Sequence, residues 1–210
     1  MVVLHHTAMT TCKAAIARLC DPDTEVSAHY VIAEDGTILS LVPEEMRAWH
    51  AGGGAWGAVR DVNSHSVGIE ICNAGPLDAH PPYPEVQMAA LEALLPGILA
   101  RHGIAPARVI AHSDMAPERK WDPGAKFDWR RLALGGLSIW PQAGGDTGAE
   151  FFASAARIGY RLPAISDDPA GDVLGAFRLR FRPGATGPVD DQDRALAADL
   201  AKRYPGPDNA

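Results

Sequence analysis

The chain has 210 residues, of which 47% are hydrophobic, and its formal net charge is −7 at pH 7. This length and apolar content suffice for one sizeable core, or for a moderate domain with a small one attached. The negative charge argues against nucleic acid as a partner, because a polyphosphate would be repelled. No stretch approaches the ~18 apolar residues of a membrane helix, so we expect no membrane span.

Short elements dominate the beginning of the chain. The apolar residues at 1–6 predict a strand, and the spacing at 10–19 predicts a helix that an Asp-Pro pair ends. Asp35-Gly36 is a strong hairpin signal. The segments on its two sides, 29–33 and 37–42, therefore predict the outgoing and returning strands of a hairpin.

The middle of the chain contains the clearest helix. Segment 66–73 alternates and predicts another strand, whereas residues 84–102 carry apolar side chains at helical spacing and end at Gly103. The remaining elements are a strand at 108–111, a loop at 112–126 and a short helix at 127–134. Strands and helices alternate, which predicts an α/β fold with a mixed central sheet flanked by helices.

A glycine-rich segment at 142–148 predicts a linker. Three helical patterns follow it, at 149–158, 169–181 and 190–204. We therefore expect a first domain at 1–141 and a small all-α three-helix domain at 149–210. About 60 residues is close to the lower limit for independent folding.

The three cysteines, Cys12, Cys20 and Cys72, are too few and too widely spaced to predict a disulfide framework. We expect them to be buried as small apolar side chains in a reducing compartment. The first residues lack the pattern of a secretory signal. The sequence as written therefore predicts a cytoplasmic protein, or a periplasmic or envelope protein if a signal segment precedes Met1. A strand that starts almost at the first residue keeps the second alternative open.

Three side chains form a candidate metal site. His5 ends the first predicted strand, His112 follows the strand at 108–111, and Asp122 lies in a proline-containing loop. Two histidines and a carboxylate recur as the protein ligands of catalytic zinc, with the fourth position left for water. The same set suits non-haem iron. Spacing alone also leaves open that these are ordinary core or surface histidines, or that His6 competes with its neighbour as a ligand.

Five motifs strengthen the metal interpretation. In order along the chain they are Val-Leu-His-His-Thr-Ala (3–8), Ser-Ala-His-Tyr-Val-Ile (27–32), Ala-Trp-His-Ala-Gly (48–52), Val-Gly-Ile-Glu-Ile-Cys-Asn (67–73) and Ala-His-Ser-Asp-Met-Ala-Pro-Glu-Arg-Lys-Trp-Asp-Pro-Gly (111–124). Together they resemble the bacterial N-acetylmuramoyl-L-alanine amidases of the AmpD and AmiD type, whose superfamily includes the peptidoglycan recognition proteins. The resemblance covers about residues 2–134, and the last motif is the most diagnostic.

The resemblance implies that His5, His112 and Asp122 bind one zinc ion per chain. It matches Glu70 and Lys120 to the family's catalytic residues. Glu70 would transfer a proton from water to the leaving amine, and Lys120 would stabilise the oxyanion. The implied reaction is hydrolysis of the amide bond between N-acetylmuramic acid, or its anhydro form, and L-alanine in peptidoglycan or muropeptides.

Four further residues are candidates for substrate contact: Trp49, His50, Asn73 and His29. For His29 a structural role is an equal alternative. The sequence departs from the family pattern at His6, Cys72 and Glu118, where relatives often have Tyr, a second Glu and Gly. None of these departures removes a ligand or the proposed acid and base.

The C-terminal helices resemble the peptidoglycan-binding domain that follows the catalytic domain in AmiD-like amidases. A helical cap that only packs on the first domain is an alternative. For the whole chain, the alternative to an enzyme is a non-catalytic muropeptide-binding sensor, although such sensors typically lose a metal ligand. We expect a monomer, and the choice between soluble anhydro-muropeptides and polymeric wall stays open.

Overall fold

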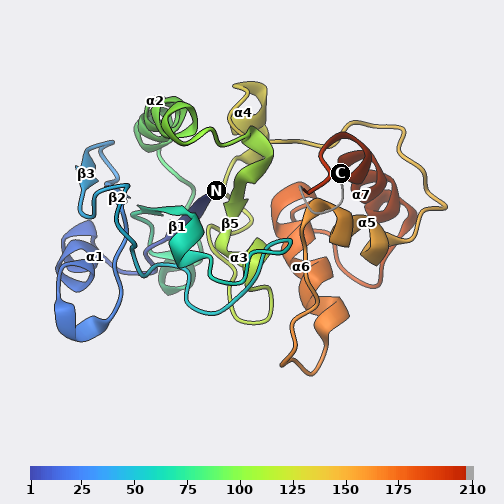
Figure 1. Cartoon of the computed structure of the whole chain (residues 1–210), viewed down its shortest axis with the longest axis horizontal. Helices are drawn as coiled ribbons and strands as arrows, with labels where there is room; N and C mark the ends of the chain where they lie inside the picture. The colour runs from blue at the N-terminus through green and yellow to red at the C-terminus, as the bar shows by residue number, and fades with distance from the viewer. Residues whose placement is uncertain (207–210) are drawn as a thin grey trace.

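The computed structural model describes residues 1–206, in which five strands form one mixed sheet with the order β3-β2-β4-β1-β5 (Figure 1). The strands are β1 (Val2–His6), β2 (Tyr30–Ile32), β3 (Ile38–Ser40), β4 (Val67–Ile71) and β5 (Val109–Ala111). Neighbouring strands are parallel, except that β3 is the antiparallel hairpin partner of β2. This sheet confirms the predicted α/β class with a mixed central sheet.

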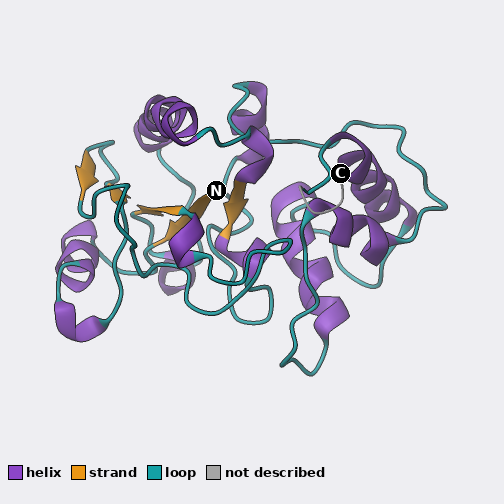
Figure 2. Ribbon diagram, viewed as in Figure 1, coloured by secondary structure: helices purple, strands orange, loops and turns teal. Residues whose placement is uncertain are grey.

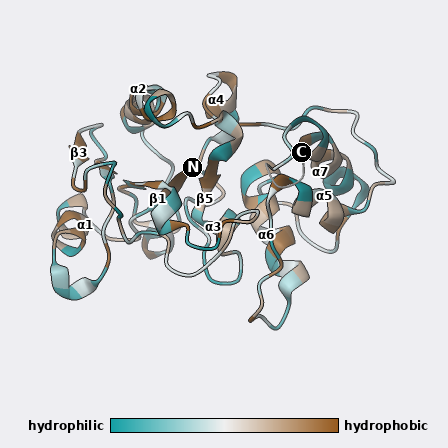
Figure 3. Ribbon diagram, viewed as in Figure 1, coloured by the Kyte–Doolittle hydropathy of each residue, from teal (hydrophilic) through white to brown (hydrophobic). Residues whose placement is uncertain are grey.

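Helices α2 (Glu85–His102) and α4 (Trp129–Leu134) cover one face of the sheet (Figure 2). Alternate residues of the strands point toward them, so that Leu4 and Ile69 pack with Leu95 in one buried cluster. Figure 3 shows β1 and β5 largely in the colour of hydrophobic residues. As predicted, α2 ends at Gly103, whose φ of 59° is the left-handed conformation that favours glycine.

The opposite face of the sheet packs against the C-terminal helices. These are α5 (Phe151–Ile158), α6 (Pro169–Phe181) and α7 (Asp191–Arg203). Val3 and Ile110 of the sheet belong to the same buried cluster as Phe151, Phe177 and Leu200 of the helices. The predicted three-helix region is therefore present and shares its core with the sheet. Its division from the first domain at residues 142–148 stays a prediction.

A buried polar network joins the C-terminal helices to the end of β5. Arg180 of α6 forms an ion pair with Asp114 and also donates to the carbonyl oxygen of Val109, at 2.8 Å. The Tyr160 hydroxyl donates to the other carboxylate oxygen of Asp114. Asp114 lies in the single helical turn α3 (His112–Met115), at a position where the sequence predicted a loop. The loop prediction is wrong for this turn, because contacts distant in sequence hold it.

The prediction that all three cysteines are unbonded and buried is wrong. Cys12, the first residue of α1 (Cys12–Leu19), forms a disulfide with Cys72, and their Cα atoms lie 5.3 Å apart. Cys20 is free and exposed. This pairing could not be predicted from the sequence, because 60 residues separate the two cysteines. The fold brings the start of α1 next to the end of β4, where the two side chains meet.

Short 3₁₀ turns complete the secondary structure, at Pro22–Thr24, Asn63–His65, Gly75–Asp78 and Pro106–Arg108. None of the helices found between residues 1 and 206 combines the length and the apolar character required to cross a bilayer.

Candidate metal centre and active site

Three neighbouring parallel strands deliver polar side chains to one place. In the pairing of β1 with β4, His5 lies opposite Glu70. In the pairing of β1 with β5, Leu4 lies opposite Ala111, so His112 follows level with His5. Alternation along each strand turns these three polar side chains to the same face. They meet at the carboxyl ends of the parallel strands, which is where ligands bind in open sheets of this kind.

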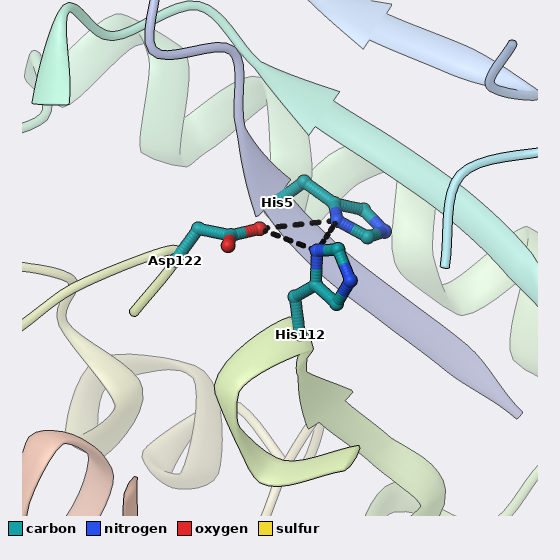
Figure 4. A group of neighbouring side chains, drawn as sticks. All are labelled: His5, His112 and Asp122. Carbon is teal, nitrogen blue, oxygen red and sulfur yellow. Dashed lines mark hydrogen bonds and ion pairs between the residues drawn. The ribbon is translucent and has the colours of Figure 1, made fainter. Parts of the chain in front are cut away.

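His5, His112 and Asp122 converge as a group of possible metal ligands (Figure 4). The two Nδ1 atoms are 2.8 Å apart, and Oδ2 of Asp122 lies 3.1 Å from Nδ1 of His5 and 3.0 Å from Nδ1 of His112. Donor atoms about 2.0–2.2 Å from a tetrahedral ion stand roughly 3.3–3.6 Å apart. The triangle therefore needs only a slight expansion to hold one zinc ion.

The electrostatics of the group suit a cation. Burial, followed by the charge of His112, lowers the pKa of His5 to about 4, so this imidazole is neutral at neutral pH. Burial alone would raise the pKa of Asp122, but His112 and His5 outweigh it and hold that pKa well below its ordinary value. A neutral imidazole and an ionised carboxylate are the forms that bind metal.

Glu70 and Lys120 lie beside this group. Burial first, and then the charge of Asp122, raises the pKa of Glu70 well above its ordinary value, while the Lys120 ammonium opposes the shift. Among the described residues, Oε2 of Glu70 has no hydrogen-bond partner. A half-buried carboxyl group with a raised pKa and an unpaired oxygen that is shielded from solvent can take up and release a proton at the site.

A cavity of about 660 Å³ opens over the group. Its floor contains the three candidate ligands and Glu70, and one wall is formed by Ala15, Arg18 and Leu19 of α1. This volume is within the range of sites for small ligands.

Two of the predicted substrate-contact residues line the cavity. Trp49 is 51% exposed, and the guanidinium of Arg47 lies 5.2 Å from the centre of its ring. Its position supports the predicted contact. His50 is buried, and its two ring nitrogens already contact His5 at 2.9 Å and Ser66 at 3.2 Å. For His50 the geometry favours a role toward the metal ligand over a direct one toward substrate.

The other two predicted contacts, His29 and Asn73, are not among the residues that line the cavity. Nδ1 of His29 accepts from the backbone N–H of Gly68, and its Nε2 contacts the carbonyl oxygen of Met46 at 3.0 Å. The side-chain amide of Asn73 accepts from the N–H of Gly75 and donates to the carbonyl oxygen of Pro81. Both side chains hold backbone segments around the site, which favours structural roles.

His6 had remained an alternative ligand in the sequence, and two residues that line the cavity, Arg119 and Trp121, were not predicted. His6 alternates to the opposite face from His5 and is not in the ligand group. Arg119 donates to the carbonyl oxygen of Ala51, at 2.8 Å, and so braces the cavity wall. Trp121 is 63% exposed at the cavity mouth. The position of this tryptophan in the last motif, between Lys120 and Asp122, was the signal that the sequence offered for it.

Comparison with known proteins gives the class of this one. Residues 1–125 match the family model described as N-acetylmuramoyl-L-alanine amidase. AmiD of Escherichia coli is 34% identical over 97% of this chain and 83% of its own length. AmpD of Citrobacter freundii is 38% identical over 107 residues, which are 51% of this chain and 55% of AmpD. The protein is therefore an amidase.

Within that class, the chain belongs to the N-acetylmuramoyl-L-alanine amidase family, in its AmpD and AmiD type, as the five motifs predicted. A structure of E. coli AmiD with anhydro-N-acetylmuramic acid-L-Ala-D-gamma-Glu-L-Lys matches with a TM-score of 0.87 and 33% identity, over 98% of this chain and 90% of AmiD. AmpDh3 of Pseudomonas aeruginosa matches with a TM-score of 0.88 and 32% identity, over 98% and 92%. These matches include the C-terminal helices.

Proposed function

We propose that the protein is a zinc-dependent amidase that hydrolyses the bond between N-acetylmuramic acid, or anhydro-N-acetylmuramic acid, and L-alanine. The observation that carries the proposal is the convergence of His5, His112 and Asp122 on one point at the floor of the cavity. Similarity to AmiD supports the substrate class, because AmiD binds an anhydro-muramyl peptide as substrate. The size of the cavity is compatible with such a ligand.

The donor set favours zinc among the divalent metals. Two imidazole nitrogens and one carboxylate oxygen leave the fourth tetrahedral position open for a reactant. When bound, zinc acts as a Lewis acid that polarises the amide carbonyl and increases the acidity of water. Non-haem iron has a similar donor set, so metal analysis of the purified protein is the direct check of this choice.

Glu70 and Lys120 supply the proton transfer and the charge stabilisation. Glu70 takes a proton from the water that attacks the carbonyl carbon, and it returns a proton to the nitrogen as the carbon–nitrogen bond breaks. A nearby cation favours the ionised form of Glu70, which is the form that accepts a proton. The ammonium of Lys120 lines the same cavity and stabilises the negative charge that develops on the carbonyl oxygen.

We propose Trp49 as a contact for the sugar or peptide, because its ring is exposed at the cavity wall. Direct contacts by His50, Asn73 and His29 were also predicted from sequence, but their ring and amide groups are engaged elsewhere. For residues 149–206, the shared core and the pair of Arg180 with Asp114 support a cap that braces the site.

The test is digestion of soluble anhydro-muropeptides and of intact sacculi, with released stem peptide measured by mass spectrometry. We expect release by the zinc-loaded protein and loss of release in Glu70→Gln, with zinc content unchanged. Binding without release by the wild-type protein would instead support a muropeptide sensor. The two substrates together separate a preference for soluble fragments from a preference for polymeric wall.

We infer that the protein works in an oxidising compartment, because the Cys12–Cys72 disulfide would be reduced in the cytoplasm. The check is acid quenching of cells and alkylation of the unfolded protein in denaturant without reductant, followed by mass spectrometry. We expect one alkylated thiol, Cys20. Alkylation of all three cysteines would support the cytoplasmic alternative.

A further inference from the structure

Both candidate histidine ligands turn their second ring nitrogen toward the same two residues, His50 and Ala51. Nε2 of His5 lies 2.9 Å from Nδ1 of His50, and Nε2 of His112 lies 2.9 Å from the carbonyl oxygen of Ala51. All of these groups are buried. One short segment therefore contacts both ligands on the side away from the metal position.

The contact of His112 fixes the position of its proton. A carbonyl oxygen only accepts hydrogen bonds, so Nε2 of His112 must carry the proton that it donates to Ala51. In a neutral imidazole the other nitrogen then has a free lone pair. For His112 that nitrogen is Nδ1, which is the atom that faces His5 and Asp122.

The position of the proton on His5 is fixed by a chain of hydrogen bonds through His50 and Ser66, which also ends at a backbone carbonyl oxygen. The Ser66 hydroxyl lies 2.6 Å from the carbonyl oxygen of Val62, so its proton points there. The Ser66 oxygen therefore accepts from Nε2 of His50, at 3.2 Å. Nδ1 of His50 is left as an acceptor, and it takes a hydrogen bond from Nε2 of His5. Nδ1 of His5 consequently keeps its lone pair for the metal position.

We propose that His50, together with the carbonyl group of Ala51, is a positioning element that holds both histidine ligands in the Nε2-protonated tautomer before the metal arrives. This inference rests on the zinc site of the proposed function and deepens it. Outer contacts of this type orient a ligand ring and increase its basicity. The roles of the two residues differ, because His50 acts through its side chain and Ala51 through its backbone.

The segment is itself held in place. Oδ1 of Asn63 accepts from the backbone N–H groups of His50, at 3.1 Å, and Ala51, at 2.8 Å. Gly68 of β4 provides the space for the imidazole, since a Cβ atom there would lie 2.3 Å from the His50 ring. These contacts give the ring of His50 one position, as a positioning role requires.

The experiment compares His50→Ala with His50→Asn. The Asn side-chain oxygen can take the place of Nδ1 and accept from His5, whereas Ala offers no acceptor. Two properties are measured: the protonated ring nitrogens of the metal-free protein, by long-range ¹H–¹⁵N NMR, and the zinc dissociation constant, by competition with a chelator. His65→Ala is the matched control, because His65 is exposed and its ring nitrogen hydrogen-bonds to the carbonyl oxygen of Asp61, outside the candidate ligand group.

We expect both ligand histidines of the wild-type protein to carry the proton on Nε2. In His50→Ala, zinc affinity should fall about 10–100-fold, and His5 but not His112 should lose its single tautomer. His50→Asn should recover part of the affinity, and His65→Ala should match the wild type. If His50→Ala fails to fold, Ser66→Ala is the second variant, with a smaller loss of affinity expected.

Two results would overturn the inference: a proton on Nδ1 of His5 in the metal-free wild-type protein, or unchanged zinc affinity in folded His50→Ala. A wild-type protein that binds no zinc would instead overturn the proposed zinc dependence. Since the tautomers are measured without metal, the two failures are distinguishable.

Discussion

The two faces of the sheet are stabilised in different ways. Under α2 and α4 the strands present mainly apolar side chains, such as Leu4 and Ile69, which pack against Leu95. On the opposite face apolar packing is combined with buried charges, above all the pair of Arg180 with Asp114. Apolar burial is non-directional and tolerates small rearrangements, whereas a buried charge depends on one partner in one place. The active site lies on the face that packs against α5–α7, where buried charges contribute.

The largest effect is expected when the buried ion pair is broken. Arg180→Met removes the cation and leaves the Asp114 carboxylate buried without it. Loss of one partner of a buried pair typically costs about 3–5 kcal/mol. Urea unfolding of the variant and the wild type measures the difference, and zinc affinity should fall as well, because Asp114 shares α3 with His112.

The double variant Arg180→Met with Asp114→Asn is the control for this prediction. It removes both charges, so part of the lost stability should return. If Arg180→Met alone lowers the free energy of unfolding by less than about 1 kcal/mol, the packing of α5–α7 on the sheet does not depend on this ion pair.

On the face of the sheet under α2 and α4, Leu95→Ala should destabilise the protein without affecting the metal site. The side chain of Leu95 is fully buried between α2 and the sheet. Its truncation should cost about 2–5 kcal/mol, depending on how far the cavity closes. Zinc affinity, measured under conditions where the variant is folded, should equal that of the wild type. A weakened metal site in this variant would contradict the separation of the two faces.

Removal of the metal should affect stability by a somewhat smaller amount. A ligand present at about a hundredfold excess over its dissociation constant stabilises the folded state by about 2.7 kcal/mol. Addition of a chelator should therefore lower the unfolding midpoint of the wild-type protein. In His112→Ala, which lacks one candidate ligand, the chelator should hardly change the unfolding midpoint. An equal fall of the midpoint in both proteins would contradict the proposed metal site.

The smallest effect is expected at an ionic cluster near the sheet edge, where Glu44 contacts Tyr30, Arg101 and His102. Hydrogen bonding to Arg101 is the main cause that lowers the pKa of Glu44 to about 2 from 4.5. The Glu44 contribution is therefore complete above about pH 4.5 and is lost as the pH falls through about 2. Because Arg101 is solvent-exposed, Glu44→Gln should cost at most about 1 kcal/mol at neutral pH.

Urea unfolding of Glu44→Gln and the wild type, at neutral pH and near pH 2, checks this sign. The difference between the two proteins should shrink as the pH falls. A difference that grows toward low pH would show that the Glu44 contacts do not act through its charge.

The elements of the fold were predictable because periodicity records which side of a strand or helix is buried. Residues 84–102 and the alternating segment at 66–73 are examples. Periodicity does not record which strands are neighbours or how they are aligned. The alignment of His5 with Glu70, the disulfide of Cys12 and the turn at 112–115 all depend on such neighbours.

For the site, the identity of the residues was predictable from the sequence, but their hydrogen bonds were not. The motifs identified His5, His112 and Asp122, and the structure brings these three together. The environment of His50 was not predictable, because its contacts lie in strands and loops that are distant in sequence. A motif therefore indicated which residues take part, while the direction of each hydrogen bond required coordinates.

The core shared between the sheet and α5–α7 has a practical consequence for protein engineering. The glycine-rich stretch at 142–148 looks like a convenient place to shorten the chain or to attach a different C-terminal domain. Cutting there would expose the apolar side chains of Val3 and Ile110 to solvent. It would also remove Arg180, the ion-pair partner of the Asp114 carboxylate. A working chimera would have to import replacements for Phe177 and Arg180, so the unit of exchange is the whole chain.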